Sequence, residues 1–248
     1  MPPIKGDVEF KNVTFSYEDG VEILKKVSFK AKKGQTVAIV GPTGAGKTTI
    51  VNLLSRFYNV DSGEVLIDGI DISKVTIRSL RKQMGVMMQD SFIFSGTVMD
   101  NIRYGNKEVS DEQVIQAAKT VCAHDFIMEM ENGYYTQINE RGSRLSQGQR
   151  QLISFARALL ADPKILILDE ATSSIDTETE ILLQKGLNEL LKGRTSFIIA
   201  HRLSTIKNAD FIMYIDAGGI AEMGSHEELI SQKGEYYKLY MSQYDFLK

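Results

Sequence analysis

A glycine-rich stretch at residues 39–50, IVGPTGAGKTTI, constrains this chain more than any other part of its sequence. It fits the pattern G-x-x-x-x-G-K-[ST], whose fixed positions here are Gly41, Gly46, Lys47 and Thr48. Residues 36–40 before it are apolar and β-branched, which predicts a buried strand. The apolar residues after it follow a helical spacing. Strand, glycine-rich turn and helix together predict a cradle for nucleotide phosphates.

Each group of this cradle has an expected role. Glycines let backbone N–H groups turn toward an anion, and the helix N-terminus adds partial positive charge. Lys47 is expected to reach the β- and γ-phosphates, and the Thr48 hydroxyl to bind Mg²⁺. A glycine-rich turn without a ligand is the competing interpretation, and the flanking strand and helix disfavour it. The expected nucleotide contacts are Gly41, Pro42, Thr43, Gly44, Ala45, Gly46, Lys47, Thr48 and Thr49.

Composition sets wider limits. The 248 residues are 43% hydrophobic and 25% charged, as in ordinary soluble globular proteins. The 29 basic and 32 acidic residues give a net charge of −3, which does not support a nucleic-acid-binding face. A single cysteine, Cys122, excludes an internal disulfide framework. No apolar run approaches the ~18 residues that span a bilayer, and the start, MPPIK, resembles a cut made in a longer protein.

Polar residues end three further predicted strands, at the edge where open α/β sheets bind their ligands. They are Gln89 after one apolar run, Asp169 and Glu170 after a second, and His201 after a third. The second run lacks alternation, which indicates a strand covered on both faces. If that strand adjoins the one before the phosphate loop, Asp169 holds the Mg²⁺ shell and Glu170 takes a proton from an attacking water.

Each of these polar residues also has a structural interpretation. Gln89 is either a plain polar strand end or an amide that contacts Mg²⁺ or water through its oxygen. The two acids are either catalytic or part of an acidic turn that caps the next helix. A lone histidine at a strand end is more often structural. We expect His201 to be functional, because Gln89, Asp169 and Glu170 end other predicted strands at the same edge of the sheet. His124 and His226 are interpreted as structural because neither follows such a strand.

An antiparallel meander is predicted before the phosphate loop. Residues 7–15 alternate apolar and polar with one slip, which predicts a half-buried strand with a bulge. A turn and a second strand pattern at residues 21–32 follow. Tyr17 lies where this meander turns. It is either an ordinary strand-end aromatic or a ring that stacks on a purine base.

Residues 91–164 are mostly helical in pattern. Ser110 is a predicted N-cap with a glutamine at the capping-box position. A later helix places Ser146 and Gly148 at its N-terminus, which makes a second site ready for an anion. The tail at residues 225–248 carries tyrosines at helical spacing, so we expect an amphipathic helix used for packing or partner contact.

Together these motifs resemble the nucleotide-binding domain of an ABC transporter, nearly from end to end. Residues 41–48 resemble its Walker A motif, residues 165–170 its Walker B motif with the catalytic glutamate, and residues 145–149, LSQGQ, the ABC signature. The positions that match the A-loop, Q-loop, D-loop and H-switch are Tyr17, Gln89, residues 174–176 and His201. Phosphate loops are widespread, but one followed by this signature shortly before the Walker B strand is highly specific.

The resemblance implies an α/β fold with a P-loop NTPase (RecA-like) core, an N-terminal antiparallel β-subdomain and an inserted α-helical signature subdomain. Residues 1–248 would form one ABC ATPase domain. Residues 1–90 and 161–248 would make the core and the β-subdomain. Residues 91–160 would make the helical subdomain.

The resemblance also implies a mechanism. Two such domains would pair head to tail, with each ATP between one Walker A motif and the partner's signature. The residues that contact the partner's ATP would be Ser146, Gln147, Gly148 and Gln149. Asp176 would link the two sites. The catalytic groups would be Glu170, His201, Lys47 and Gln89, and the Mg²⁺ ligands Thr48, Gln89 and Asp169.

Residues 136–142 resemble the segment before the signature in exporters. With residues 92–98, they would face the coupling helices of a transmembrane partner in the same full-length polypeptide. The domain would then lie on the cytoplasmic face of a membrane, bind no nucleic acid, and power export as hydrolysis reopens the pair.

One position departs from the family pattern. The third signature residue is usually glycine and here is Gln147, as in heterodimeric exporters in which one of two sites hydrolyses poorly. Since a signature serves the opposite ATP, this chain's own Walker site is expected to be competent and the partner's site impaired. Whether the native partner is identical or different stays open.

Three rival functions are weighed against the exporter motor. A soluble ABC ATPase of DNA repair or translation usually carries coiled-coil or basic insertions, and none is visible. A regulatory or channel-gating module would bind nucleotide with little turnover, which Glu170 and His201 weigh against. A phosphate-loop kinase or GTPase would leave residues 145–149 unexplained.

Overall fold

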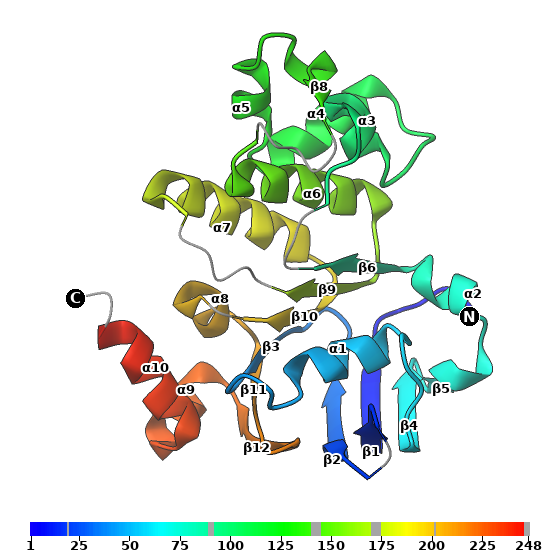
Figure 1. Ribbon diagram of the computed structural model, residues 1–248, viewed down its shortest axis with the longest axis vertical. Coiled ribbons are helices and arrows are strands. Elements are labelled where there is room, and N and C mark those ends of the chain that lie inside the picture. The colour runs from blue at the N-terminus through cyan, green and yellow to red at the C-terminus, as the bar shows by residue number, and fades with distance from the viewer. Residues whose placement is uncertain (19, 89–91, 140–144, 170–174, 201, 246–248) are drawn as a thin grey trace. The chain divides into compact units, whose positions relative to one another are not determined.

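The computed structural model describes residues 1–18, 20–88, 92–139, 145–169, 175–200 and 202–245 (Figure 1). The chain divides into two compact units. Unit 1 comprises Met1–Val86, Lys164–Thr172 and Gly193–Lys248, and unit 2 comprises Met87–Pro163 and Ser173–Lys192.

A six-stranded sheet in the order β12-β11-β3-β10-β9-β6 carries the phosphate loop. Its strands are β3 (Thr36–Val40), β6 (Met84–Met87), β9 (Ile165–Asp169), β10 (Thr195–Ile199), β11 (Phe211–Asp216) and β12 (Gly219–Gly224). β3 pairs in parallel with β10 and β11, and β10 pairs in parallel with β9. The continuous apolar runs of β3, β9 and β10 are almost wholly buried, as a sheet covered on both faces requires. This arrangement confirms the predicted α/β fold.

A second sheet of unit 1 is antiparallel, in the order β2-β1-β4-β5, and confirms the predicted meander. Its strands are β1 (Val8–Ser16), β2 (Glu22–Ala31), β4 (Ser62–Ile67) and β5 (Ile70–Asp71). The register of β1 against β2 shifts after Phe10, near Asn12 with its φ of 48°, which is the bulge expected from the slip in alternation. The apolar side chains of β1 and β2 join those of β3 and β10 in one core.

Helix α1 (Lys47–Leu54) follows the phosphate loop and lies between the two sheets of unit 1 (Figure 1). Its apolar residues Ile50, Leu53 and Leu54 are buried in the core that both sheets share. The other helices of unit 1 that precede β11 are short: η1 (Ile72–Lys74), α2 (Ile77–Arg81) and α8 (Leu203–Lys207). Burial of this apolar face therefore fixes the position of α1 relative to both sheets of unit 1.

The tail forms two helices, so the single amphipathic helix expected from the sequence is wrong. α9 (His226–Gln232) begins at a capping box between Ser225 and Glu228. It ends at Lys233, whose φ of 53° turns the chain before α10 (Glu235–Asp245) begins. A residue in the left-handed conformation is a common way to end a helix. The tail tyrosines all lie after this turn, so their spacing does not reveal it.

Side-chain contacts fix the start of α10. Glu222 of β12 accepts hydrogen bonds from the backbone N–H groups of Glu235 and Tyr236, at the start of that helix. Tyr236 is fully buried, and its hydroxyl lies 2.7 Å from Nδ1 of His226. Burial lowers the pKa of His226. These contacts give His226 the structural role expected of it.

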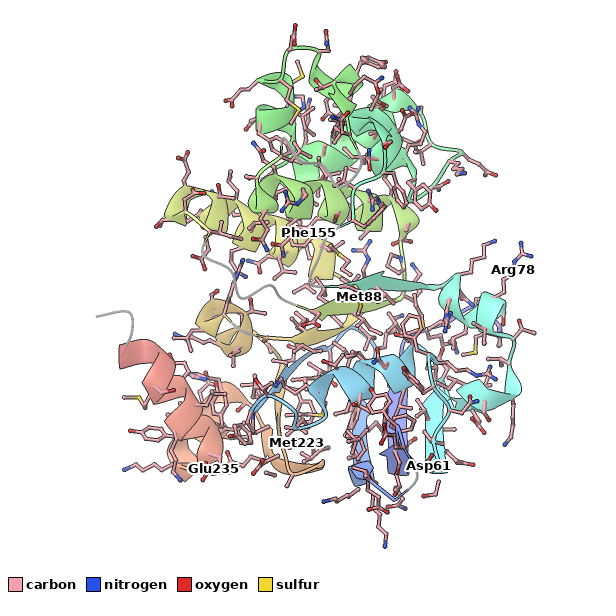
Figure 2. All side chains as sticks on the ribbon, in the orientation of Figure 1. Asp61, Arg78, Met88, Phe155, Met223 and Glu235 are labelled. Carbon is pink, nitrogen blue, oxygen red and sulfur yellow. The ribbon has the colours of Figure 1, made fainter. Side chains whose placement is uncertain are left out.

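Unit 2 is mainly helical, and α6 is its central element. Its elements are β7 (Gly96–Thr97), α3 (Val98–Arg103), α4 (Asp111–Thr120), α5 (His124–Met128), η2 (Gly133–Tyr135), β8 (Gln137–Ile138), α6 (Gln147–Ala161) and α7 (Thr177–Leu191). Helices α3, α4 and α7 all pack against α6, whose apolar face includes the buried Phe155 (Figure 2). His124 has the structural role expected of it, because its Nδ1 bonds the Tyr134 hydroxyl at 2.9 Å.

The structure groups α7 with the helices of unit 2, whereas the sequence boundaries assign residues 161–248 to the core. The single-domain organisation and its internal boundaries stay predictions. Among the described residues, no helix is long and apolar enough to span a lipid bilayer.

Candidate nucleotide-binding site

The phosphate loop depends on glycine at its first position. Gly41 has a φ of 138°, and a Cβ atom there would lie 2.1 Å from the carbonyl oxygen of Ile215 on β11. Real Cβ atoms do not approach a backbone oxygen so closely, so any side chain would push the loop off the sheet. The positive φ values of Gly44 and Gly46, 81° and 106°, complete a turn that other residues adopt only with strain.

The N-terminus of α1 has no side-chain cap. Gly46 is its N-cap and has no side chain to accept a hydrogen bond, and no acidic residue lies in the first turn. Most helices satisfy these first N–H groups with a side-chain oxygen or water. Here the donors and the positive end of the helix dipole remain for an anion, which is the arrangement that binds phosphate.

Lys47 extends back over the loop. Its Nζ atom donates hydrogen bonds to the carbonyl oxygens of Gly41 at 2.8 Å and Pro42 at 2.7 Å. Desolvation lowers the pKa of Lys47, and the negative charge of Asp169 opposes that shift. The loop itself therefore fixes the position of the ammonium group beside the uncapped helix end.

Asp169 ends β9 at the carboxyl edge of the sheet and is half-buried. The condition set for the role of Asp169, that its strand adjoins the strand before the phosphate loop, is not met, because β10 lies between β3 and β9. Asp169 nevertheless interacts electrostatically with Lys47. Helix α1 follows β3 and contacts β10, the strand that lies between β3 and β9.

The residues at this edge fit Mg²⁺. Thr48 is exposed at the start of α1 and offers a hydroxyl oxygen, and Asp169 offers a carboxylate. Magnesium prefers such oxygen ligands and in nucleotide sites takes most of its shell from phosphates and water. Among the described residues, no group of three or more His, Cys, Asp or Glu side chains could hold a metal by itself.

Tyr17 lies at the end of the β1–β2 hairpin, as expected, with 46% of its surface exposed. Its ring contacts Phe15 and Tyr58 edge to face, with centroids 4.9 and 5.0 Å away. Its hydroxyl shares a hydrogen bond of 3.1 Å with Oγ1 of Thr49 on α1. The ring therefore belongs to the same unit as the phosphate loop and is tied to the helix that follows that loop.

The signature residues form the start of α6 in unit 2. Ser146 is the N-cap, and its Oγ accepts a hydrogen bond from the backbone N–H of Gln149. Gln149 Oε1 accepts one in return from the backbone N–H of Ser146, which completes a capping box. Gln147 occupies the first helical position and is half-buried. A glutamine in place of glycine is therefore compatible with an intact helix start.

Gly148 and Asp176 both have local structural roles. A Cβ atom on Gly148 would lie 2.2 Å from Cγ2 of Thr179, so glycine lets α7 approach α6. Asp176 is the N-cap of α7 and accepts a hydrogen bond of 2.9 Å from the Thr179 backbone N–H. Backbone hydrogen bonding of this kind lowers the pKa of Asp176. Their predicted roles toward ATP stay predictions.

Four site positions predicted from the sequence lie outside the described residues. They are Gln89, Glu170, Ser174 and His201. The structure brings the remaining core candidates together: the loop from Gly41 to Thr49, Asp169 and Tyr17 all belong to unit 1.

Sequence reasoning missed two residues that support Tyr17. Asn52 Nδ2 donates a hydrogen bond of 3.5 Å to its hydroxyl, and Tyr58 packs against its ring. The signal for Asn52 was present, because positions three apart lie on one helix face and Thr49 is three residues earlier. Tyr58 gave no such signal, since its approach to Tyr17 depends on how two distant segments pack.

Comparison with known proteins assigns this arrangement to a family. The family model for "ABC transporter" matches residues 24–173, more than half of the chain. The chain is 55% identical over 245 residues to the uncharacterized ABC transporter ATP-binding protein YfiC of Bacillus subtilis, covering 99% of this chain and 41% of that protein. It is 48% identical to a fatty acid ABC transporter ATP-binding/permease protein of Mycobacterium bovis, covering 96% of this chain and 38% of that protein.

A solved structure of a bacterial Atm1-family ABC exporter with ATP bound matches with a TM-score of 0.89 and 43% identity. The match covers 98% of this chain and 44% of the exporter chain. The chain thus spans about two fifths of the length of the proteins it matches. The phosphate loop, the helix that starts at the signature, and these similarities lead to one assignment: the chain belongs to the ABC transporter family.

Proposed function

We propose that this chain binds and hydrolyses ATP as the motor domain of an ABC exporter. The observation that carries the proposal is the start of α1: a glycine N-cap without a capping side chain, next to an ammonium group held against the loop. Family membership supports ATP as the ligand, since ABC proteins generally bind ATP with Mg²⁺.

The chain's own residues divide the work of phosphoryl transfer. The loop N–H groups and Lys47 bind the phosphates and stabilise the charge that develops on the transferred group. Mg²⁺, held by Thr48 and Asp169 with Gln89, neutralises phosphate charge when it is bound. Glu170 accepts a proton from the attacking water, and His201 holds the γ-phosphate. The Tyr17 ring stacks on the base.

The signature acts on a second ATP. In a head-to-tail pair, the α6 N-terminus of one copy meets the γ-phosphate held by the other copy's loop, so ATP completes the interface. Ser146, Gln147, Gly148 and Gln149 make that contact, and Asp176 links the two sites. ATP binding favours the closed pair and hydrolysis reopens it, which is a population shift set by the ligand.

The remaining part of the full protein is proposed to carry the transmembrane helices that this motor drives. The M. bovis relative is named as an ATP-binding/permease protein, and the matched structure is an exporter of which this chain covers 44%. Residues 92–98 and 136–142 then face the coupling helices, and the domain lies on the cytoplasmic face of the membrane.

The deciding experiment measures the solution mass and nucleotide occupancy of the Glu170→Gln variant with Mg-ATP. Without the base, ATP is expected to stay bound and the closed pair to accumulate, which doubles the mass. A monomer with ATP bound has two explanations, a missing non-identical partner domain or missing transmembrane tethering, and adding candidate partner domains separates them. A chain that binds no ATP refutes the proposal. Turnover of the unmodified chain separates a motor from a regulatory module.

Gln147 suggests an asymmetric, heterodimeric exporter. Its side chain occupies the position where most signatures have glycine, so the partner's ATP would be hydrolysed poorly while this chain's own site works. The Gln147→Gly variant, in the assembled complex, is expected to raise turnover at the partner's site only. Unchanged turnover at both sites would contradict the asymmetry and leave the ATPase assignment intact.

A further inference from the structure

The hydroxyl of Tyr17 is held on the helix that follows the phosphate loop. It shares a hydrogen bond of 3.1 Å with Oγ1 of Thr49 and accepts a second, of 3.5 Å, from Nδ2 of Asn52. Stacking on a base needs only the face of a ring, and a phenylalanine would provide it. The hydroxyl contacts therefore require a separate explanation.

Thr49 is placed to provide that explanation. It follows Thr48 in the first turn of α1, and only 4% of its surface is exposed. A buried hydroxyl almost always has a hydrogen-bond partner, and the partner of Thr49 is the Tyr17 hydroxyl. The Tyr17 ring also makes edge-to-face contacts with Phe15 and Tyr58. All five side chains belong to unit 1.

We infer that Thr49 is a positioning residue for the base, which acts through the Tyr17 hydroxyl with help from Asn52. The pair joins the helix that binds phosphate to the ring that receives the base, so both ends of the nucleotide site are set by α1. This inference rests on the proposed function, because it concerns how the same site binds ATP.

The physical reason is preorganisation. An exposed tyrosine at a hairpin end loses rotamer freedom when a base stacks on it, and that loss weakens binding. A ring already fixed by its hydroxyl and by two neighbouring rings has less freedom to lose. Because one partly exposed hydrogen bond is involved, removing it should weaken ATP binding by about two- to tenfold.

A double-mutant cycle on this chain tests the inference. Calorimetry would measure the Kd for Mg-ATP and for inorganic tripolyphosphate, which lacks the base, in Tyr17→Phe, Thr49→Val and the double variant. We expect each single variant to weaken ATP binding by about two- to tenfold. The double variant should bind ATP no more weakly than the weaker single variant. Tripolyphosphate binding should change less than ATP binding, because Thr49→Val removes the side-chain hydroxyl and keeps the backbone N–H.

Two further variants separate positioning from loss of fold. Thr49→Ser keeps the hydroxyl and is expected to restore ATP affinity. Tyr237→Phe removes a tyrosine hydroxyl from α10 and should leave both Kd values unchanged, with the thermal midpoint of every variant measured alongside.

Two results would overturn the inference. If the effects of Tyr17→Phe and Thr49→Val multiply, the two hydroxyls act independently. If Thr49→Val weakens tripolyphosphate as much as ATP, Thr49 acts on phosphate and not on the ring. An unmodified chain that binds neither ligand would instead refute the proposed function itself, so the two failures are distinguishable.

Discussion

Two helices of this chain start where the sequence predicts an anion site, and their N-termini are built differently. α1 begins at Gly46 with no capping side chain and no acid in its first turn. α6 begins at Ser146, which forms a reciprocal capping box with Gln149. The sequence therefore predicts an anion site at both helix starts, but the two starts are capped differently.

The difference indicates two tasks. At α1 the first N–H groups are left without a side-chain acceptor, so a bound phosphate would itself serve as the cap. At α6 the protein supplies the cap, so the helix start is complete before any ligand arrives. We interpret α1 as the end that holds a nucleotide and α6 as a preformed surface for a nucleotide held by another chain.

The largest expected effect comes from the α1 end. Lys47→Ala removes the ammonium group at the loop, so ATP turnover should fall by about 100-fold or more. Single-turnover hydrolysis in the assembled transporter measures it. In the monomeric chain, Ser146→Ala should leave the Kd for ATP unchanged, because α6 is proposed to serve the partner's ATP. Equal loss of ATP binding by both variants in the monomer would contradict the division of tasks.

The next effect concerns how α6 accommodates α7. Gly148→Ala places a Cβ atom 2.2 Å from Thr179 Cγ2, which should lower the free energy of unfolding by about 1–3 kcal/mol. Thr179→Ser removes that methyl group while keeping the residue polar, so the double variant should recover most of the loss. Urea unfolding measures both. A double variant as unstable as Gly148→Ala would show that the contact is not the cause.

A smaller effect separates capping from ligand binding at α6. Ser146→Ala removes the cap and should cost about 1 kcal/mol in the free energy of unfolding. Ser110→Ala is the matched control, because Ser110 and Gln113 form the same box at α4, where no nucleotide contact is proposed. Both should destabilise alike, and Ser146→Ala alone should weaken ATP-driven pairing. Equal effects of the two variants on pairing would make the α6 start purely structural.

The smallest effect is a pH dependence at α7. Hydrogen bonds from backbone N–H groups lower the pKa of Asp176 in the folded protein. A carboxylate with a lowered pKa adds stability above its unfolded pKa, and that stability is lost as the pH falls through the folded value. Relative to Asp176→Asn, the unmodified chain should therefore lose stability below about pH 4. A difference in urea midpoint that does not change from pH 6 to pH 3 would contradict this.

Local patterns predicted much of the site. The loop glycines, the capping box at Ser110 and the helix start at Ser146 depend on residues close to one another in the sequence, so spacing alone indicates them. The prediction of a single tail helix was wrong, because all of the tail's tyrosines lie after the turn at Lys233 and their spacing therefore says nothing about where α9 ends. The roles of Gln89, Glu170 and His201 stay predictions, since these residues lie outside the described part of the chain.

By itself, the sequence determined the phosphate loop, the buried strands and the starts of α1, α4 and α6, because short-range spacing and the burial of apolar runs dictate them. Only the tertiary structure decided that β10 separates β3 from β9 and that Ile215 leaves no room for a side chain on Gly41. It also decided that Tyr17 bonds Thr49. Each of these depends on which distant segments pack together, and that pairing is set by the shape and burial of the whole core.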